Sequence, residues 1–276
     1  MALSLCPLIP ATVVPLLEAF KVRTITKGDA HQYHLCRRWQ TEIWGRLHNF
    51  PSARLTGEPC SAQILSEMIT SHPLTRQSAR NGFFVSGDYE SATDLLNPEL
   101  SQICQYEIGK RLGIPLQDQI VLNKALTNHY LVYGKKGGLI TEAYRQIWGQ
   151  LMGSPVSFPV LCIINLAATR LSFEIAHNRL FNLVDLPMVV NGDDVLFRAK
   201  DPQHYQIWKQ ITAECGLKFS LGKNYTSQRF MVINSELYRV TRSYGVKRMP
   251  QLNVRLLYGG TRSSASGLDL RPCDAN

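Results

Sequence analysis

The sequence has few of the features that mark disulfide-bonded, zinc-binding or membrane-spanning proteins. Its seven cysteines, an odd number, are scattered and form no Cys-x-x-Cys pair. This distribution indicates reduced thiols in an intracellular compartment rather than a disulfide framework or a zinc site. No run reaches the ~20 uninterrupted apolar residues of a membrane span. The apolar residues 1–17 lack a basic start and contain Pro7, Pro10 and Pro15, so we do not expect a secretion signal.

Acidic residues are also in short supply. Thirty Lys and Arg side chains stand against 21 Asp and Glu, which gives a formal net charge of +9 over 276 residues. Such a surface attracts polyanions, with nucleic acid the commonest candidate and an anionic membrane the next. Low-complexity segments and internal repeats are absent from the sequence, and hydrophobic residues make up 45% of it. We therefore expect one large folded domain or two sub-domains.

A hairpin is predicted over residues 188–197, where two apolar β-branched runs flank Asn191-Gly192. This dipeptide readily takes the positive φ angles of a tight turn. Two adjacent carboxylates, Asp193 and Asp194, follow it. An isolated pair of this kind is typical of an ordinary turn, because Asp is a common turn residue. The alternative is a carboxylate pair that binds divalent metal ions, and that interpretation requires another carboxylate from elsewhere in the chain.

A partner carboxylate is found at Asp88. An apolar run at residues 83–85 leads through Gly87 to Asp88 at the end of a predicted strand, and Asp94 then begins a helical pattern. If this strand lies beside the hairpin, Asp88 meets the Asp pair on adjacent strands of one sheet. Carboxylate oxygens are the ligands that Mg²⁺ and Mn²⁺ prefer. The alternatives are an ordinary turn residue for Asp88 and a helix cap for Asp94.

Basic residues alternate along a strand predicted at residues 20–27. Lys21, Arg23 and Lys27 fall at even spacing, so they project from one face of a regular strand. A one-sided basic strand suits contact with phosphate. An edge strand with protective charges has the same pattern, so both interpretations stay open here.

A flexible loop is predicted at residues 149–158. Its glycines and its hydroxyl groups on Ser154 and Ser157 can approach a ligand closely. The loop opens onto a long apolar helix at residues 159–183, which also carries Asn165. Burial explains most of this helix but does not explain the polar side chain of Asn165.

The remaining segments are expected to be helices, turns and loops. Lys223 is placed in a turn, and a hairpin centred on Asn234-Ser235 follows it. Helices are predicted at residues 29–48, 62–69 and 202–215, with two more between 97 and 131. A loop is expected at 51–59, a turn with a basic tip at 133–140, and a tail beyond 259 that is disordered or the start of something longer.

Taken in order, these segments resemble the palm motifs of viral RNA-directed RNA polymerases. The strand ending at Asp88, the Gly-rich loop with its helix, the Gly-Asp-Asp hairpin and the Lys223 turn resemble motifs A, B, C and D. The basic strand resembles motif F of the fingers. The sequence is especially similar to the polymerases of ourmia-like viruses and narnaviruses in four segments. These are residues 86–94 (Ser-Gly-Asp-Tyr-Glu-Ser-Ala-Thr-Asp), 152–159 (Met-Gly-Ser-Pro-Val-Ser-Phe-Pro), 222–225 and 233–238.

This resemblance implies an α+β right-hand polymerase fold, with an antiparallel palm sheet and packed helices. Residues 1–80 are expected to be partial fingers and residues 81–240 the palm, with an inserted fingers segment at about 97–147. Residues 241–276 would begin the thumb or form a disordered tail. Such polymerases are usually much longer, so we expect a core fragment whose thumb is largely missing.

The resemblance also implies a reaction, which is RNA-templated RNA synthesis that replicates a positive-strand RNA virus genome in the host cell cytoplasm. RNA template, RNA product and ribonucleoside triphosphates are the implied partners, and two Mg²⁺ or Mn²⁺ ions are the implied cofactors. Asp88 and Asp193 would be the main metal ligands, with Asp194 in support. The nucleotide would be bound by Lys21, Arg23, Asp94, Ser154, Ser157 and Asn165, of which Asp94, Ser157 and Asn165 would read the ribose 2′-hydroxyl, and Lys223 would donate a proton to pyrophosphate.

Two other functions stay open on the sequence. One is a catalytically inactive or truncated remnant of viral origin that at most binds RNA. The other is a reverse transcriptase, which shares the palm but usually has Tyr or Phe two places before the Asp pair, where this chain has Asn191.

Overall fold

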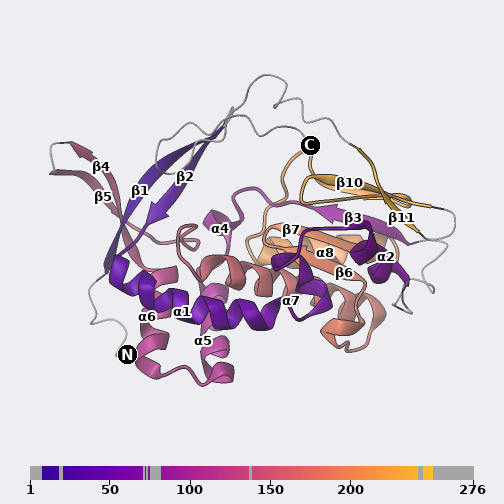
Figure 1. Ribbon diagram of the computed structural model, residues 1–276, viewed down its shortest axis with the longest axis horizontal. Coiled ribbons are helices and arrows are strands. Elements are labelled where there is room, and N and C mark those ends of the chain that lie inside the picture. The colour runs from indigo at the N-terminus through magenta and orange to yellow at the C-terminus, as the bar shows by residue number, and fades with distance from the viewer. Residues whose placement is uncertain are drawn as a thin grey trace.

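The computed structural model describes residues 8–18, 21–70, 72, 74, 82–136, 139–241 and 245–250. These residues form three β-sheets with helices packed between and beside them. Figure 1 shows one sheet projecting on the left, the other two stacked on the right, and the helices α1, α5 and α6 along the lower side.

The central sheet has the strand order β6-β7-β3-β8, and every pair in it is antiparallel. It is built from β3 (Phe83–Gly87), β6 (Met188–Asn191), β7 (Asp194–Ala199) and β8 (Tyr225–Ser227). Strands distant in the sequence are therefore neighbours in space, since β3 lies directly beside β7. This arrangement confirms that the strand leading to Asp88 and the hairpin with the Asp pair share one sheet.

Both faces of β3, β6 and β7 are buried, which explains why these three strands are mainly apolar, whereas β8 is largely exposed. Val85 and Phe197 belong to a core that includes residues of α7 (Ser157–His177) and α8 (Pro202–Glu214). Phe84 and Leu196, one residue along each strand, belong to a second core with residues of α2 (Ala62–Thr70). The alternation follows from the two-residue repeat of a strand.

A second sheet has the order β11-β10-β9 and packs near the central one. Its strands are β9 (Phe230–Ile233), β10 (Glu236–Val240) and β11 (Val246–Arg248). Asn234 and Ser235 have φ angles of 51° and 62°, as both central residues of a type I′ turn require. The hairpin predicted at these two residues is confirmed.

The third sheet has the order β2-β1-β4-β5. It contains β1 (Ile9–Glu18), β2 (Lys21–Lys27), β4 (His129–Lys136) and β5 (Leu139–Arg145), and only β2 was predicted. The prolines of β1 argue against a strand in the sequence, yet Pro15 pairs with Thr24 and Pro10 with Tyr130. The turn with a basic tip predicted at residues 133–140 lies between the ends of β4 and β5, where Lys136 pairs with Leu139, and the two strands themselves were not predicted.

The predicted helices are present as α1 (Ala30–Leu47), α2, α5 (Pro98–Leu112), α6 (Leu116–Leu126) and α8. Asp29 caps α1 by accepting a hydrogen bond from the backbone N–H of Gln32 at 3.0 Å. A short helix, α4 (Ala92–Leu95), and two 3₁₀ helices, η2 (Pro51–Thr56) and η3 (Leu183–Asp185), complete the set. The prediction of a loop at residues 51–59 is therefore wrong for residues 51–56, which form η2.

Helix α7 runs through the centre of the molecule. It ends at His177 rather than near residue 183, because Asn178 takes a left-handed φ of 49° and closes it. Among the described residues, α7 alone is long and apolar enough to cross a membrane, and 61% of the relevant window is buried inside the protein. A core helix passes the same test, and α7 packs in that way against α5 and α8.

The predicted division into fingers, palm and thumb stays a prediction. Residues 251–276, which include most of the expected thumb or tail, lie outside the described residues.

Candidate active site

The Asp pair lies at the tip of the β6–β7 hairpin. Asn191 pairs with Asp194, so Gly192 and Asp193 are the two turn residues. Gly192 has a φ of +68°, whereas Asp193 is not left-handed, a combination that fits a type II′ turn. The turn was expected at Asn191-Gly192 and is centred one residue later, because the glycine takes the first turn position. Asp193 is thus at the tip and Asp194 begins β7.

Asp88 lies beside this tip. Gly87 pairs with Val195 across β3 and β7, so Asp88 and Asp194 follow one step further along the two neighbouring strands. Burial of the Asp194 carboxyl group away from solvent raises its pKa to about 7, and the nearby charges of Asp193 and Asp88 contribute to the increase. Burial away from solvent also raises the pKa of Asp193, and the nearby negative charge of Asp88 raises it further. The three carboxylates therefore share one electrostatic environment and repel one another.

Lys223 faces the same cluster from the turn before β8. Its Nζ atom lies 3.0 Å from Oδ2 of Asp88, and its charge offsets part of the burial-driven rise in the pKa of Asp193 and Asp194. Asn224 fixes the turn in place, because its side chain accepts from the backbone N–H of Asp88 at 3.2 Å and donates to the backbone C=O of Asp88 at 3.0 Å. The turn predicted at Lys223 is confirmed and lies against Asp88.

The basic strand β2, which belongs to the third sheet, reaches the site. The charge of Arg23 offsets a small part of the burial-driven rise in the pKa of Asp193, so its guanidinium group acts on the hairpin tip. The side chain of Lys21 lies outside the described residues. Near the end of β2, the Thr26 hydroxyl accepts a hydrogen bond from the backbone N–H of Gly153 at 3.1 Å. The strand thus rests on the Gly-rich loop.

Asp94 and Ser154 lie near this loop. Asp94 lies in α4, where partial burial of its carboxyl group raises its pKa. Gly149 packs so closely that a Cβ there would lie 2.4 Å from the backbone oxygen of Asp94, and the neighbouring Gln150 donates its N–H to Thr93 at 2.8 Å. The hydroxyl of Ser154 is buried and has no hydrogen-bond partner among the described residues.

Ser157 and Asn165 are both buried and bonded to protein groups. The Ser157 hydroxyl oxygen accepts from the side-chain amide of Gln150 at 3.0 Å. Asn165 is 0% exposed, donates to the backbone C=O of Gly192 at 3.1 Å and accepts from the Tyr89 hydroxyl at 3.2 Å. Their expected contact with ribose stays a prediction.

The second sheet also touches the hairpin tip. The backbone N–H of Asn234 donates to the Asp194 carboxylate and offsets part of the burial-driven rise in its pKa. The Asn234 side-chain oxygen accepts from the Asn191 amide at 3.0 Å. The hairpin at Asn234-Ser235 therefore supports Asp194 through a backbone hydrogen bond.

Sequence reasoning assigned no role to several residues that hold the site together. They lie in or beside the segments that resemble polymerase motifs, but their contacts join parts of the chain that are far apart. They are Thr26, Tyr89, Gln150, Cys162, Asn224 and Asn234. The one available signal was position, since Tyr89 and Asn224 each follow a predicted site residue directly.

The donor set suits a hard divalent cation. Asp88, Asp193 and Asp194 offer only carboxylate oxygens, and their mutual repulsion favours a bound positive charge. In the described part of the chain, no three His, Cys, Asp or Glu side chains are already gathered closely enough to hold a metal ion. Asp88 pairs with Lys223 instead. The residues fit the expected group in chemistry, and metal binding requires their side chains to turn toward one another.

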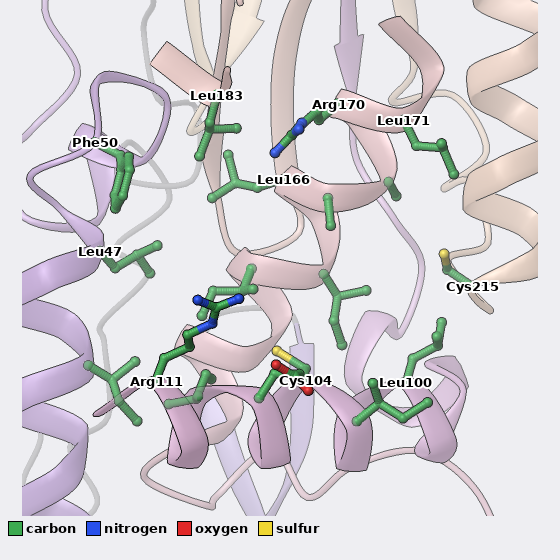
Figure 2. Close-up of a pocket in the computed structure, with 18 of the residues that line it drawn as sticks. Leu47, Phe50, Leu100, Cys104, Arg111, Leu166, Arg170, Leu171, Leu183 and Cys215 are labelled. Carbon is green, nitrogen blue, oxygen red and sulfur yellow. The ribbon is translucent and has the colours of Figure 1, made fainter. Parts of the chain in front are cut away.

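A large cavity lies elsewhere. It has a volume of about 830 Å³, and Figure 2 shows side chains of α1, α5 and α7 facing one another across it. Its walls are mainly apolar, with Arg111 and Arg170 among the few charged groups. None of the three site carboxylates lines it. The candidate site lies instead at the ends of the neighbouring strands β3 and β7.

Sequence comparison points to one group of viral enzymes. The chain is 36% identical over 253 residues to the RNA-dependent RNA polymerase of Ourmia melon virus (isolate Melon/Iran/VE9), an alignment that covers 89% of this chain and 29% of that protein. The chain resembles the polymerases of ourmia-like viruses and narnaviruses. The RNA-directed RNA polymerase of Saccharomyces 23S RNA narnavirus is 31% identical over 169 residues, covering 58% of this chain and 17% of the relative. No protein-family model matches the chain.

Comparison with solved structures establishes the right-hand polymerase fold. The RNA-dependent RNA polymerase of a human picorbirnavirus has a TM-score of 0.70 at 14% identity, over 90% of this chain and 47% of that one. A telomerase from Candida albicans has a TM-score of 0.62 at 13% identity, over 92% of this chain and 47% of that one. The chain spans less than a third of the viral polymerases that it matches in sequence and about half of these two structures.

Proposed function

We propose that the chain is the palm-centred segment of an RNA-directed RNA polymerase that replicates a positive-strand RNA virus genome. The observation that carries this proposal is the meeting of Asp88 with Asp193 and Asp194 on adjacent antiparallel strands, with Lys223 beside them. Similarity to viral RNA polymerases supports it. Asn191, two places before the Asp pair, favours an RNA polymerase over a reverse transcriptase.

In this proposal, Asp88 and Asp193 are the main ligands of two Mg²⁺ or Mn²⁺ ions, and Asp194 supports them. When bound, such ions stabilise the attacking 3′-hydroxyl and the leaving pyrophosphate oxygen of an in-line phosphoryl transfer. Asn224 and Asn234 contribute by fixing Asp88 and Asp194 through backbone hydrogen bonds. Positioned charge of this kind is the main catalytic resource in phosphoryl transfer.

Other residues bind the incoming ribonucleotide. Lys21 and Arg23 neutralise the triphosphate, which agrees with the effect of Arg23 on Asp193. Lys223 donates a proton to the leaving pyrophosphate. Asp94 reads the ribose 2′-hydroxyl, the group that separates RNA from DNA precursors. The unpartnered, buried hydroxyl of Ser154 is the second candidate for a polar contact to the nucleotide.

The division of the chain follows from the same proposal. Residues 1–80 are partial fingers, residues 81–240 are the palm with an inserted segment at about 97–147, and residues 241–276 begin the thumb or form a tail. RNA template and product bind through their phosphates to the positively charged surface, given the net charge of +9. The site of action is the host cell cytoplasm.

Primer extension on an RNA template with Mg²⁺ tests the proposal. The wild-type chain is compared with Asp193→Asn and with Asp185→Asn, an exposed acid of η3 that precedes β6 and so lies at the end of that strand opposite the hairpin tip. We expect incorporation by the wild type and the control, and a loss of at least 100-fold in Asp193→Asn. Equal incorporation by all three refutes the assignment. RNA binding by a wild type that incorporates nothing would identify the inactive remnant instead.

A further inference from the structure

Side chains of helix α7 form hydrogen bonds with both backbone polar groups of the turn residue Gly192. The Gly192 N–H donates to Sγ of Cys162 at 3.1 Å, and Nδ2 of Asn165 donates to the Gly192 C=O at 3.1 Å. Cys162 and Asn165 are three residues apart, so they lie on the same face of the helix. A Cβ at Gly192 would lie 2.8 Å from Cε2 of Phe158, one turn earlier on that face.

Asn165 has a second contact that leads to Asp88. Its Oδ1 atom accepts from the hydroxyl of Tyr89, which is 2% exposed and directly follows Asp88. The Tyr89 ring is itself held by stacking on Phe219, with ring centroids 5.9 Å apart, and against Trp208 at 6.2 Å. A buried chain of hydroxyl, carboxamide and carbonyl thus joins the residue after Asp88 to the residue before Asp193.

We propose that Asn165 and Tyr89 are positioning residues, which set the separation of the Asp88 and Asp193 carboxylates for the metal ions. The inference rests on the proposed function. The carboxylates repel one another. A neutral hydrogen-bonded link beneath them resists that repulsion and is shielded from water.

The chemistry of the asparagine side chain fits this task. A carboxamide donates and accepts at once, so one side chain bonds to both the Tyr89 hydroxyl and the Gly192 carbonyl. Aspartate accepts only, and leucine of similar size does neither. This also explains the polar residue in an otherwise apolar helix, and it gives Asn165 a role that requires no contact with ribose.

Tyr89→Phe is the decisive variant, since it keeps the ring and removes one hydroxyl. Asn165→Leu removes both contacts, and Tyr238→Phe is the matched control. Tyr238 is 0% exposed, and its hydroxyl bonds to Glu236 rather than to the α7 network. Binding of Mn²⁺ to the full chain, without RNA or nucleotide, is measured by electron paramagnetic resonance of the free ion, alongside the melting temperature.

We expect Tyr89→Phe and Asn165→Leu to weaken Mn²⁺ binding by about 10-fold or more, as loss of a residue that orients metal ligands does. Tyr238→Phe should bind Mn²⁺ like the wild type even where its melting temperature falls equally. A Tyr89→Phe affinity within twofold of wild type overturns the inference while leaving the proposed function intact. Failure of the unaltered chain to bind Mn²⁺ more tightly than Asp193→Asn overturns both.

Discussion

Substitution of Gly153 by alanine adds one methyl group, which should push the basic strand β2 away from the Gly-rich loop at residues 149–158. A Cβ at this residue would lie 1.6 Å from the backbone oxygen of Thr26, so loop and strand must move apart by roughly 2 Å to reach ordinary contact. Gly153→Ala also breaks the hydrogen bond from the Gly153 N–H to the Thr26 hydroxyl. We expect a loss of folding stability of about 2–4 kcal/mol from overpacking and the lost hydrogen bond.

The same displacement moves Arg23 away from Asp193, because both Arg23 and Thr26 belong to β2. A misplacement of about 1 Å at a reacting centre can reduce a rate 100-fold, so the rate of nucleotide incorporation should fall by at least that factor. Primer extension and thermal unfolding measure the two effects. Gly45→Ala is the control, since nothing lies within 4 Å of its Cβ and alanine favours the helix. Wild-type stability and activity in Gly153→Ala would refute this reasoning.

Three further predictions concern the charged groups. The folded chain keeps the Asp194 proton up to about pH 7, whereas the unfolded chain loses it near pH 3.8, so without metal this residue lowers stability as the pH rises between those values. Asp194→Asn should therefore raise the free energy of unfolding by about 1–2 kcal/mol at pH 8, allowing for solvent screening, and change it little at pH 4; an equal effect at both pH values would contradict this. Lys223→Met should change the free energy of unfolding by less than about 1 kcal/mol, because the ion pair with Asp88 is at the surface. The same variant should slow nucleotide incorporation by about 100-fold, as loss of a proton donor does. Quench-flow measurement of the incorporation rate tests this, and a wild-type rate would contradict the assignment of Lys223 as the donor. RNA affinity, measured by fluorescence anisotropy, should fall linearly with salt on logarithmic axes, and a flat dependence would exclude phosphate-driven binding.

The parts of the fold that local signals determine could be predicted from the sequence. Turn glycines, caps and strand alternation placed the β6–β7 hairpin, the strand leading to Asp88 and most of the helices. The convergence of Asp88 with the Asp pair followed from the ends of those strands and is confirmed by the pairing of Gly87 with Val195. The turn was misplaced by one residue because Asn191 and Gly192 both tolerate a positive φ, and only the strand register decides between them.

Other parts depend on contacts that the sequence does not encode locally. Strand β1 was missed because its prolines argue against a sheet, while its pairing with β2 and β4 is a tertiary outcome. The hydrogen bonds from Asn224 to Asp88 and from Asn191 to Asn234 join distant segments, so no spacing rule reveals them. Asn165 illustrates the point most clearly, since its polarity was visible as an anomaly and its partners were not.

The site consists of two layers with different physical tasks. The outer layer is charged and open to water, with Asp193 exposed at the tip and Lys223 exposed beside Asp88. The inner layer is neutral and buried, and it holds the tip through Cys162 and Asn165. Charges that must bind and release ions and nucleotides need solvent access, whereas groups that fix geometry hold best where water cannot compete for their hydrogen bonds. Substitutions should therefore separate into two classes: those in the outer layer change ionic affinity and pH dependence with little loss of stability, and those in the inner layer reduce stability and metal affinity together.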